Sequence, residues 1–234
     1  MGLHPLFTLG GRLQLCASMV RDQTTLTDIG TDHAYLPIWL AKQGRIVKAI
    51  AADVRTGPLE SAKQNIIRYG VQELVSTRLS DGLAAIQPEE AEDIVMAGMG
   101  GGLIRQLISA VPWVKEDGKQ LILQPMTSIP QLREFLEDEG FAVVREQAAI
   151  EENHAYTVML VRYQPEKVAT DVLYPYIGKL DGSHPDNREY MKRLAVNLDK
   201  KARGLRISGQ NEDADALNEI IRRIREIAEK EELS

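Results

Sequence analysis

The sequence predicts an α/β fold: a mostly parallel sheet ends in an antiparallel hairpin, and an antiparallel pair of helices follows it. Three observations support this prediction. Short apolar runs alternate with segments of helical periodicity through the first two thirds of the chain. Two long strand-like runs then follow one another with no helix between them. Beyond a connector, apolar residues recur at the three- and four-residue spacing of amphipathic helices.

The alternating region predicts the parallel sheet. Its strands are expected, in order, at Thr25 to Ile29, Val47 to Ala52, Leu74 to Leu79, Asp93 to Ala97 and Gln120 to Gln124. Its helices are expected at Ala34 to Gln43, Pro58 to Tyr69, Leu103 to Ala110 and Ser128 to Gly140. Ser128 is the expected N-cap of the last helix and Gly140 the residue just past its end. Repetition at this spacing is typical of parallel strands joined by right-handed crossovers.

The next two strand-like runs are Phe141 to Ile150 and Ala155 to Tyr163. Because only four residues join them, they must pair as an antiparallel hairpin. Five parallel strands followed by such a hairpin is the layout of class I methyltransferases. We therefore expect residues 1–163 to form one Rossmann-like methyltransferase domain.

The rest of the chain is expected to form a connector, residues 164–185, and a helical hairpin, residues 186–234, with its turn at Ser208 to Asn211. The first helix is basic: residues 186–207 hold seven basic and three acidic side chains, in a chain of net charge −6. Such a stripe can contact phosphates, and a solvated helix face is the alternative. The candidate RNA-binding residues are Arg188, Lys192, Arg193, Lys200 and Lys201.

Composition excludes several classes of protein. The chain has 44% hydrophobic and 26% charged residues, as soluble globular proteins do. It has no apolar run near the roughly 18 residues of a membrane span, and no signal peptide is evident. The single cysteine, Cys16, excludes an internal disulfide and a cysteine-clustered zinc site. We expect a cytoplasmic monomer with no metal and no membrane partner.

Acidic residues follow three successive strands of the predicted sheet. The loop after the first strand has one glycine, Gly30, instead of the G-x-G-x-x-G of NAD-binding folds. Its acids, Asp28 and Asp32, disfavour a pyrophosphate and suit a cationic ligand. Asp53 follows the second strand, where a carboxylate can bind both ribose hydroxyls, and Asp81 follows the third, where it can face an adenine amino group. This set suits S-adenosylmethionine; a helix cap at Asp28 and ordinary turn acids are the alternatives.

A glycine-rich segment, Met96 to Gly102, follows the fourth strand and allows a ligand or a flat base to approach the backbone closely. It lacks the Asn/Asp-Pro-Pro-Tyr/Phe segment that often holds an amino nitrogen in methyltransferases, so a ring nitrogen is the favoured target. A flexible turn is the alternative. Arg12 is interpreted as a surface charge rather than as a residue at the mouth of the site. The candidate cofactor-binding residues are Asp28, Gly30, Thr31, Asp53, Val54, Asp81, Gly82, Met96, Ala97 and Gly98, and the candidate catalytic residues are Asp32, His33 and Tyr35.

Four segments together resemble one family: residues 28–37 (DIGTDHAYLP), 52–54 (ADV), 80–82 (SDG) and 96–101 (MAGMGG). They are similar to the bacterial tRNA (adenine-N1)-methyltransferases of the TrmK type. The resemblance extends through residues 123–125, the hairpin around Glu152 and Tyr156, and the helical hairpin; Ser80 stands where the family often has glycine. It implies that S-adenosylmethionine donates a methyl group to N1 of adenosine 22 in the tRNA D-arm, with the helical hairpin as the candidate tRNA-binding part.

We expect direct in-line transfer to a flipped-out base, because N1 of adenine has an in-plane lone pair and needs no covalent intermediate. Asp32 is the candidate to stabilise the positive charge that methylation leaves on the base. Two alternatives stay open: a methyltransferase acting on another RNA or a non-RNA substrate, and a non-catalytic RNA-binding module that has kept a cofactor fold. A dehydrogenase is disfavoured because the second and third glycines are missing.

Overall fold

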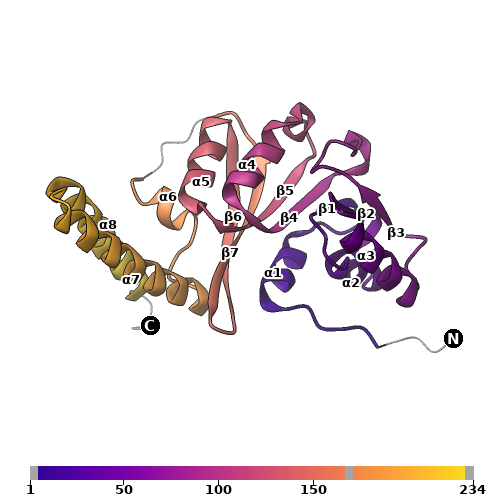
Figure 1. Ribbon diagram of the computed structural model, residues 1–234, viewed down its shortest axis with the longest axis horizontal. Helices are drawn as coiled ribbons and strands as arrows, with labels where there is room; N and C mark the ends of the chain where they lie inside the picture. Colours follow the sequence, from indigo (N-terminus) through magenta and orange to yellow (C-terminus); the bar gives the residue numbers. More distant parts are fainter. Residues whose placement is uncertain (1–4, 167–170, 230–234) are drawn as a thin grey trace.

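The computed structural model describes residues 5–166 and 171–229 and has a three-layer α/β/α core with a helical arm (Figure 1). Its seven-stranded sheet has the order β3-β2-β1-β4-β5-β7-β6. Strands β1 to β5 run parallel, and β7 pairs antiparallel with both β5 and β6, as predicted. The strands are β1 (Thr24–Ile29), β2 (Ile46–Asp53), β3 (Val75–Leu79), β4 (Asp93–Gly100), β5 (Gln120–Thr127), β6 (Phe141–Glu151) and β7 (His154–Tyr163).

Helices cover both faces of the sheet. One face packs against α1 (Gly11–Met19), α2 (Tyr35–Lys42) and α3 (Thr56–Arg68), and the other against α4 (Gly101–Ser109) and α5 (Ile129–Asp138). Successive side chains of β2 point to opposite faces of the sheet, so this strand contributes to both cores. Ala49 and Ala51 join the core under α1 to α3, whereas Ile50 and Ala52 join the core on the other face. Two short 3-10 turns, η1 (Pro88–Glu90) and η2 (Pro112–Lys115), complete this part.

The sequence predicted both ends of α5, with Ser128 at its start and Gly140 just past its end. Gly140 follows the C-cap Glu139 with φ +80°, the left-handed conformation expected of a residue just past a helix end. Ser128 does occupy the N-cap position, but its φ is +53° and its side chain makes no capping hydrogen bond. The predicted N-cap position is confirmed, although the hydroxyl of Ser128 does not cap the helix.

The helical arm consists of α7 (Pro185–Ile207) and α8 (Asn211–Glu229), joined by the short turn the sequence predicted. Ion pairs Arg206–Asp215 and Arg225–Asp199 show that the two helices run antiparallel. They share a third apolar core with α6 (Tyr174–Ile177), a short helix in the connector that the sequence did not predict. The predicted ranges 1–163, 164–185 and 186–234 each extend into residues 1–4, 167–170 or 230–234, which lie outside the described residues.

A buried ion pair attaches the connector to the sheet. The guanidinium of Arg133 on α5 donates to a carboxylate oxygen of Glu146 on β6 at 2.6 Å, and both side chains are 0% exposed. Arg133 also donates to the carbonyls of Pro175 and Tyr176, at 2.7 and 3.0 Å. The second oxygen of Glu146 accepts the backbone N–H of Lys179 at 3.0 Å. This cluster ties α6 and the segment after it to the edge of the sheet.

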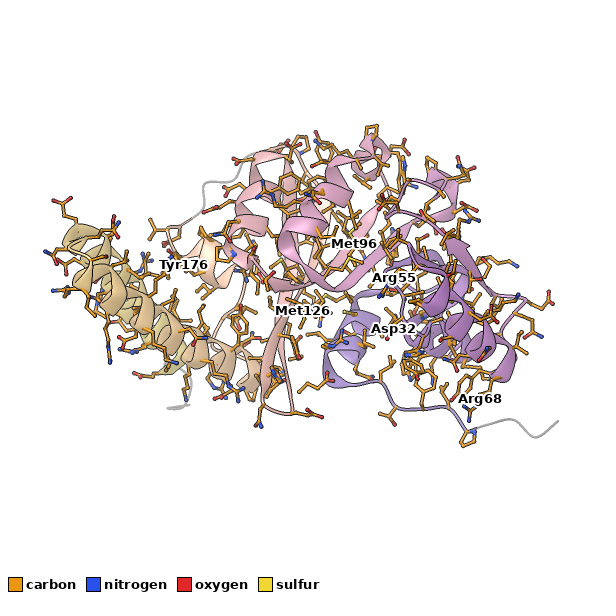
Figure 2. The ribbon with its side chains drawn as sticks, in the orientation of Figure 1. Asp32, Arg55, Arg68, Met96, Met126 and Tyr176 are labelled. Atoms are coloured by element: carbon orange, nitrogen blue, oxygen red, sulfur yellow. The ribbon has the colours of Figure 1, made fainter. Side chains whose placement is uncertain are left out.

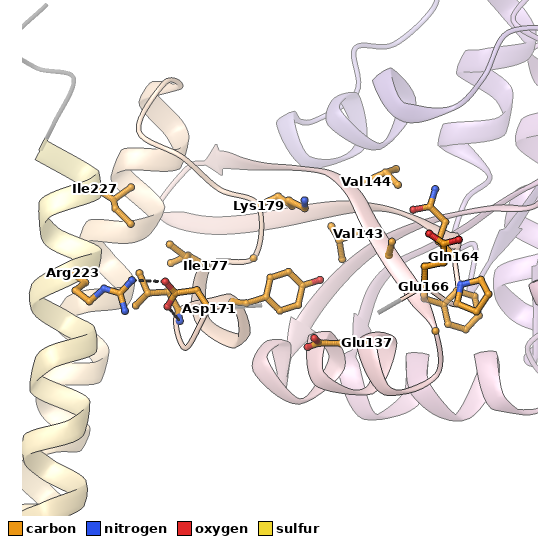
Figure 3. Close-up of a pocket in the computed structure, with 17 residues that line it drawn as sticks. Glu137, Val143, Val144, Gln164, Glu166, Asp171, Ile177, Lys179, Arg223 and Ile227 are labelled. Carbon is orange, nitrogen blue, oxygen red and sulfur yellow. Dashed lines mark hydrogen bonds and ion pairs between the residues drawn. The ribbon is translucent and has the colours of Figure 1, made fainter. Parts of the chain in front are cut away.

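A cavity of about 670 Å³ lies beside that attachment, between α5, α6, the start of β6 and α8 (Figure 3). At its rim, Arg223 on α8 pairs with Asp171 at 2.5 Å. The cavity lies at the N-terminal end of β6 and contains none of the candidate cofactor residues. It is therefore separate from the predicted site.

Candidate active site

The candidate residues gather at one edge of the sheet, where the parallel strands β1 to β4 end. The strand order reverses between β1 and β4, because β2 lies on one side of β1 and β4 on the other. Open α/β sheets bind their ligands in the crevice at such a reversal, beyond the carboxyl ends of the strands. Asp32, Arg55 and Met126 lie at this edge in Figure 2.

The loop after β1 turns back onto β2. The backbone N–H groups of Gly30 and Thr31 both donate to the carbonyl of Ala52, at 2.8 and 3.0 Å. Gly30 has φ +72°, a conformation that a side chain would strain, which explains the glycine. Helix α2 begins only at Tyr35, so the alternative in which Asp28 caps that helix is wrong.

Asp28 is a buried carboxylic acid at the end of β1. Its pKa is raised to about 6, mainly by burial; a hydrogen bond from Thr31 opposes the shift, and the nearby charge of Asp53 adds to it. Within the described residues no cation pairs with Asp28. A buried acid of this kind suits a cationic ligand, which would favour the ionised form.

Asp53 ends β2 and is also buried, at 5% exposure. Its Oδ1 accepts the backbone N–H of Arg55 at 2.8 Å, which fixes the carboxylate. Nε of Arg55 lies 3.4 Å from the same oxygen. No described residue donates to Oδ2, so that oxygen stays available to a ligand's hydroxyl groups. The neighbouring Val54 is 60% exposed and offers an apolar surface beside it.

The turn after β3 is ordered by Ser80. Its hydroxyl accepts the N–H of Ala85 at 3.1 Å and donates to the carbonyl of Gly82 at 2.7 Å. Gly82 has φ +55°, and Asp81 is exposed beside it. Ser80, which departs from the glycine of the family pattern, therefore holds the turn that presents Asp81.

Most of the glycine-rich segment predicted to follow the fourth strand forms the end of β4 instead, and two residues whose role the sequence did not reveal hold it. Gln124 is fully buried on β5, and its Oε1 accepts the N–H of Gly98 at 2.9 Å and Nη1 of Arg12 at 3.2 Å. Gly98 is exposed with φ +77°. Arg12 thus lies at the site and is not the isolated surface charge we expected. A polar residue within the apolar run of β5 was the available signal for Gln124.

Met96 and Ala97 precede Gly98 on β4. The Met96 side chain is 0% exposed and packs in the core under α4 and α5, so only its backbone can meet a ligand. Ala97 is half-buried. The predicted cofactor role of both residues stays a prediction.

The three candidate catalytic residues form an exposed rim. The Asp32 side chain is 73% exposed, and Oδ2 lies 3.3 Å from Nε2 of His33. The His33 and Tyr35 rings lie 5.2 Å apart, centroid to centroid, and Tyr35 packs edge-on against Phe7 at 4.8 Å. An exposed carboxylate, an imidazole and a phenol therefore stand together beside the loop that carries Asp28.

The five candidate RNA-binding residues all lie on α7, but they differ in their contacts. Arg188 donates to the carbonyl of Gly182 at 2.5 Å. Arg193 pairs with Glu189 and donates to the carbonyl of Asn153 at 2.8 Å. Lys192, Lys200 and Lys201 are exposed. The arginines therefore also hold the arm against its neighbours, and phosphate binding by this set stays a prediction.

The described part of the chain has neither a cluster placed to hold a metal ion nor a candidate membrane-spanning helix. Residues 5–166 and 171–229 contain no group of three or more histidine, cysteine or acidic side chains placed to hold a metal ion. None of the helices in those ranges is long and apolar enough to cross a membrane.

Comparisons with known proteins agree with the fold. Residues 9–159 match the family model described as a methyltransferase domain. The chain is 32% identical over 193 residues to the tRNA (adenine(22)-N(1))-methyltransferase of Bacillus subtilis, and the match covers 81% of each chain. It superposes on a Streptococcus pneumoniae protein described as a candidate tRNA (m1A22) methyltransferase, with TM-score 0.81 and 31% identity over 94% of this chain and all of that one. The same protein in complex with S-adenosyl-L-methionine gives TM-score 0.78 at 31% identity, over 93% and 98%.

The fold and the acid-lined edge of the sheet define a class I methyltransferase. The similarity to the Bacillus subtilis enzyme extends beyond the catalytic core. The chain belongs to the family of bacterial tRNA (adenine22-N1)-methyltransferases, the TrmK family that the sequence motifs indicated.

Proposed function

We propose that this enzyme methylates N1 of adenosine 22 in tRNA with S-adenosylmethionine as the methyl donor. The observation that carries the proposal is the pair of buried carboxylates, Asp28 and Asp53, at the reversal of strand order. Among the described residues Asp28 has no cation partner, and the cation that pairs with Asp53 is the exposed Arg55. Family membership supports the substrate, since the Bacillus subtilis relative is named for adenosine 22.

The residues at the edge fit the donor group by group. Asp28 can pair with its ammonium, Oδ2 of Asp53 can accept from its ribose hydroxyls, and Asp81 can accept from its adenine amino group. Gly30 and Gly98 leave room for close approach at the backbone. When bound, S-adenosylmethionine supplies a methyl group already activated by the sulfonium.

The protein's task in the transfer step is alignment and charge stabilisation. N1 lies on the pairing edge of adenine, so the target base has to leave its stack before its lone pair can face the methyl group. The exposed rim of Asp32, His33 and Tyr35 lies beside the cofactor loop, where such a base would enter. There Asp32 can stabilise the positive charge that forms on the base or accept a proton from its amino group.

The test is methyl transfer from labelled S-adenosylmethionine to unmodified tRNA carrying adenosine 22, beside the same tRNA with guanosine 22. We expect transfer to the first only, recovered as 1-methyladenosine. Transfer to both would retain the enzyme class and refute the site. No transfer to either, with cofactor binding intact by calorimetry, would indicate another RNA or a non-RNA substrate. Loss of cofactor binding as well would favour a non-catalytic RNA-binding module.

The role of Asp32 has its own test. Asp32→Ala should lower the rate of transfer at saturating cofactor and tRNA more than it lowers cofactor affinity, because its carboxylate is exposed at the rim and not buried with Asp28 and Asp53. Asp138→Ala, at the end of α5, is a matched exposed acid for comparison. Equal losses of rate and cofactor affinity would refute the catalytic assignment.

A further inference from the structure

Arg12 occupies an unusual position for a cation. It lies in the first turn of α1, is half-buried, and its Nη1 donates to Oε1 of the fully buried Gln124 at 3.2 Å. Its guanidinium also stands over the ring of Tyr156, 6.0 Å from the centroid. It borders Gly98, since a Cβ placed there would lie 3.6 Å from Nη1. The side chain is therefore held in place at the segment where the target base is expected.

The charge of Arg12 is not balanced by a nearby carboxylate. Glu151 accepts the backbone N–H of Arg12 at 3.0 Å, but no carboxylate of residues 5–166 and 171–229 lies within ion-pair distance of its guanidinium. Its partners are a neutral amide and an aromatic face, which fix the side chain without neutralising it. Most of its five N–H donors thus remain for a ligand. A cation fixed in this way suits a planar or tetrahedral anion.

The location favours an RNA phosphate as that anion. The β6–β7 hairpin packs against α1 on one side and α7 on the other, and Figure 1 shows it between these two helices. At its turn, the carbonyl of Asn153 accepts from Arg193 of α7 at 2.8 Å, and His154 and Tyr156 stack at 6.1 Å further along. An RNA that reaches from α7 to the strand ends therefore crosses Tyr156 and Arg12. The acids at those ends would repel its backbone, and Arg12 is the cation that borders Gly98.

We propose that Arg12 binds a backbone phosphate next to the target adenosine and thereby holds the strand while the base is turned into the site. Gln124 and Tyr156 position its guanidinium. This inference rests on the proposed function, because it needs an RNA substrate whose target base leaves its stack. It adds a substrate contact that lies on α1, apart from the basic helix of the arm.

The first experiment compares Arg12→Ala and Arg12→Lys with the wild-type enzyme on unmodified tRNA carrying adenosine 22. Arg12→Ala should raise KM for tRNA about tenfold, and the logarithm of KM should depend less steeply on the logarithm of salt concentration by about one unit. Arg12→Lys should restore part of the affinity. Lys48→Ala, at the opposite end of the sheet, is the control and should leave both quantities unchanged. Cofactor affinity and the thermal midpoint should not change in any variant.

Two results would overturn the inference. Weaker cofactor binding by Arg12→Ala would assign the guanidinium to the carboxylate of S-adenosylmethionine. A lower kcat with unchanged KM and unchanged salt dependence would mean that Arg12 only orders the Gly98 segment through Gln124. Failure of the wild-type enzyme to methylate adenosine 22 would refute the proposed function itself. That outcome is distinguished from failure of the Arg12 inference because it is seen without any variant.

A second experiment identifies the phosphate directly. Single methylphosphonate linkages, which are neutral, are placed on either side of adenosine 22 in tRNA assembled from two strands. One linkage should raise KM of the wild-type enzyme about tenfold and should have no further effect on Arg12→Ala, because the contact is already lost. Independent, additive effects of the two changes at every linkage would overturn the inference.

Discussion

Buried charged groups occur in two regions of this molecule, and the protein treats them in opposite ways. At the connector, Glu146 receives hydrogen bonds from Arg133, Thr157 and the backbone of Lys179. At the candidate site, Asp28 and Asp53 are almost as deeply buried, but Asp28 has no cation partner among the described residues and Asp53 pairs only with the exposed Arg55. The first region is nearly complete on its own; Nε of Arg133 is the one buried side-chain polar atom of the described residues without a partner. The second is complete only when a ligand supplies the missing charge and donors.

This difference separates a structural from a functional use of a buried charge. Desolvation penalises a carboxylate in both regions, and only a partner compensates for it. Where the chain provides the partner, the result is a fixed attachment between α5, β6 and α6. Where it does not, the cost remains in the ligand-free protein as a raised pKa at Asp28. Three experiments test whether the two regions differ in this way.

The largest effect is expected at the connector. Arg133→Met leaves Glu146 buried without its guanidinium and should lower the free energy of unfolding by about 3–5 kcal/mol, measured by urea denaturation. The variant with both Arg133→Met and Glu146→Leu should recover much of that loss, because no charge is then left unpaired. Arg222→Met, which removes an exposed pair with Glu219, should cause no resolvable change. A loss at Arg133 no larger than at Arg222 would contradict the structural role.

An intermediate effect is expected at Asp53. Asp53→Ala removes the acceptor proposed for the ribose hydroxyls and should weaken cofactor binding by about 1–3 kcal/mol in calorimetry. The free energy of unfolding of the ligand-free protein should change little, in contrast to Arg133→Met. Asp138→Ala removes an exposed acid at the end of α5 and serves as the control. Unchanged cofactor affinity would refute the ribose contact.

The smallest effect is expected at Asp28, where protein stability and cofactor affinity should depend on pH in opposite directions. Its pKa is about 6 in the folded protein against 3.8 ordinarily, so the folded state binds the proton more tightly. The stability that the neutral acid contributes to the ligand-free protein is therefore present below about pH 4 and lost as pH rises through about 6. Cofactor affinity should change the other way, rising about tenfold between pH 5 and pH 7 as the carboxylate ionises.

Calorimetric titrations at pH 5, 6 and 7 measure the second change, and denaturation at the same pH values measures the first. Asp28→Asn should flatten both profiles. His33→Gln is the necessary control, because His33 lies beside the carboxylate of Asp32 at the rim of the same site. If the profiles flatten in His33→Gln instead, the pH dependence does not come from Asp28. The proposed energetic cost of leaving Asp28 buried without a partner would then be refuted.

The sequence could predict the acid-lined edge of the sheet because that edge is assembled from strand ends. Asp28 lies near the end of β1, Asp53 ends β2 and Asp81 follows β3, and the parallel arrangement of these strands brings their ends together. The sheet, its final hairpin and the helical arm followed from apolar periodicity in the same way. Local patterns were enough because each of these features depends on residues that are close in the chain.

The contacts that the sequence did not predict join distant elements. Arg12 and Gln124 are 112 positions apart, and nothing near either residue indicates the other. Arg133 lies on a helix where an arginine is ordinarily a surface charge, and its partner belongs to the next strand. Ser128 occupies the N-cap position of α5 as predicted, but its φ of +53° and its missing capping hydrogen bond are details that the local sequence does not indicate.

Burial also determines the reactivity of the single cysteine. Cys16 is fully buried on α1, and burial, followed by the charge of Asp28, raises its pKa to about 12. Thiols react with oxidants and alkylating reagents as thiolates, so this sulfur should be inert at neutral pH. A single cysteine introduced on the exposed face of α7 would then be the one reactive thiol in the protein, and a fluorophore attached there would report where the arm lies as tRNA binds.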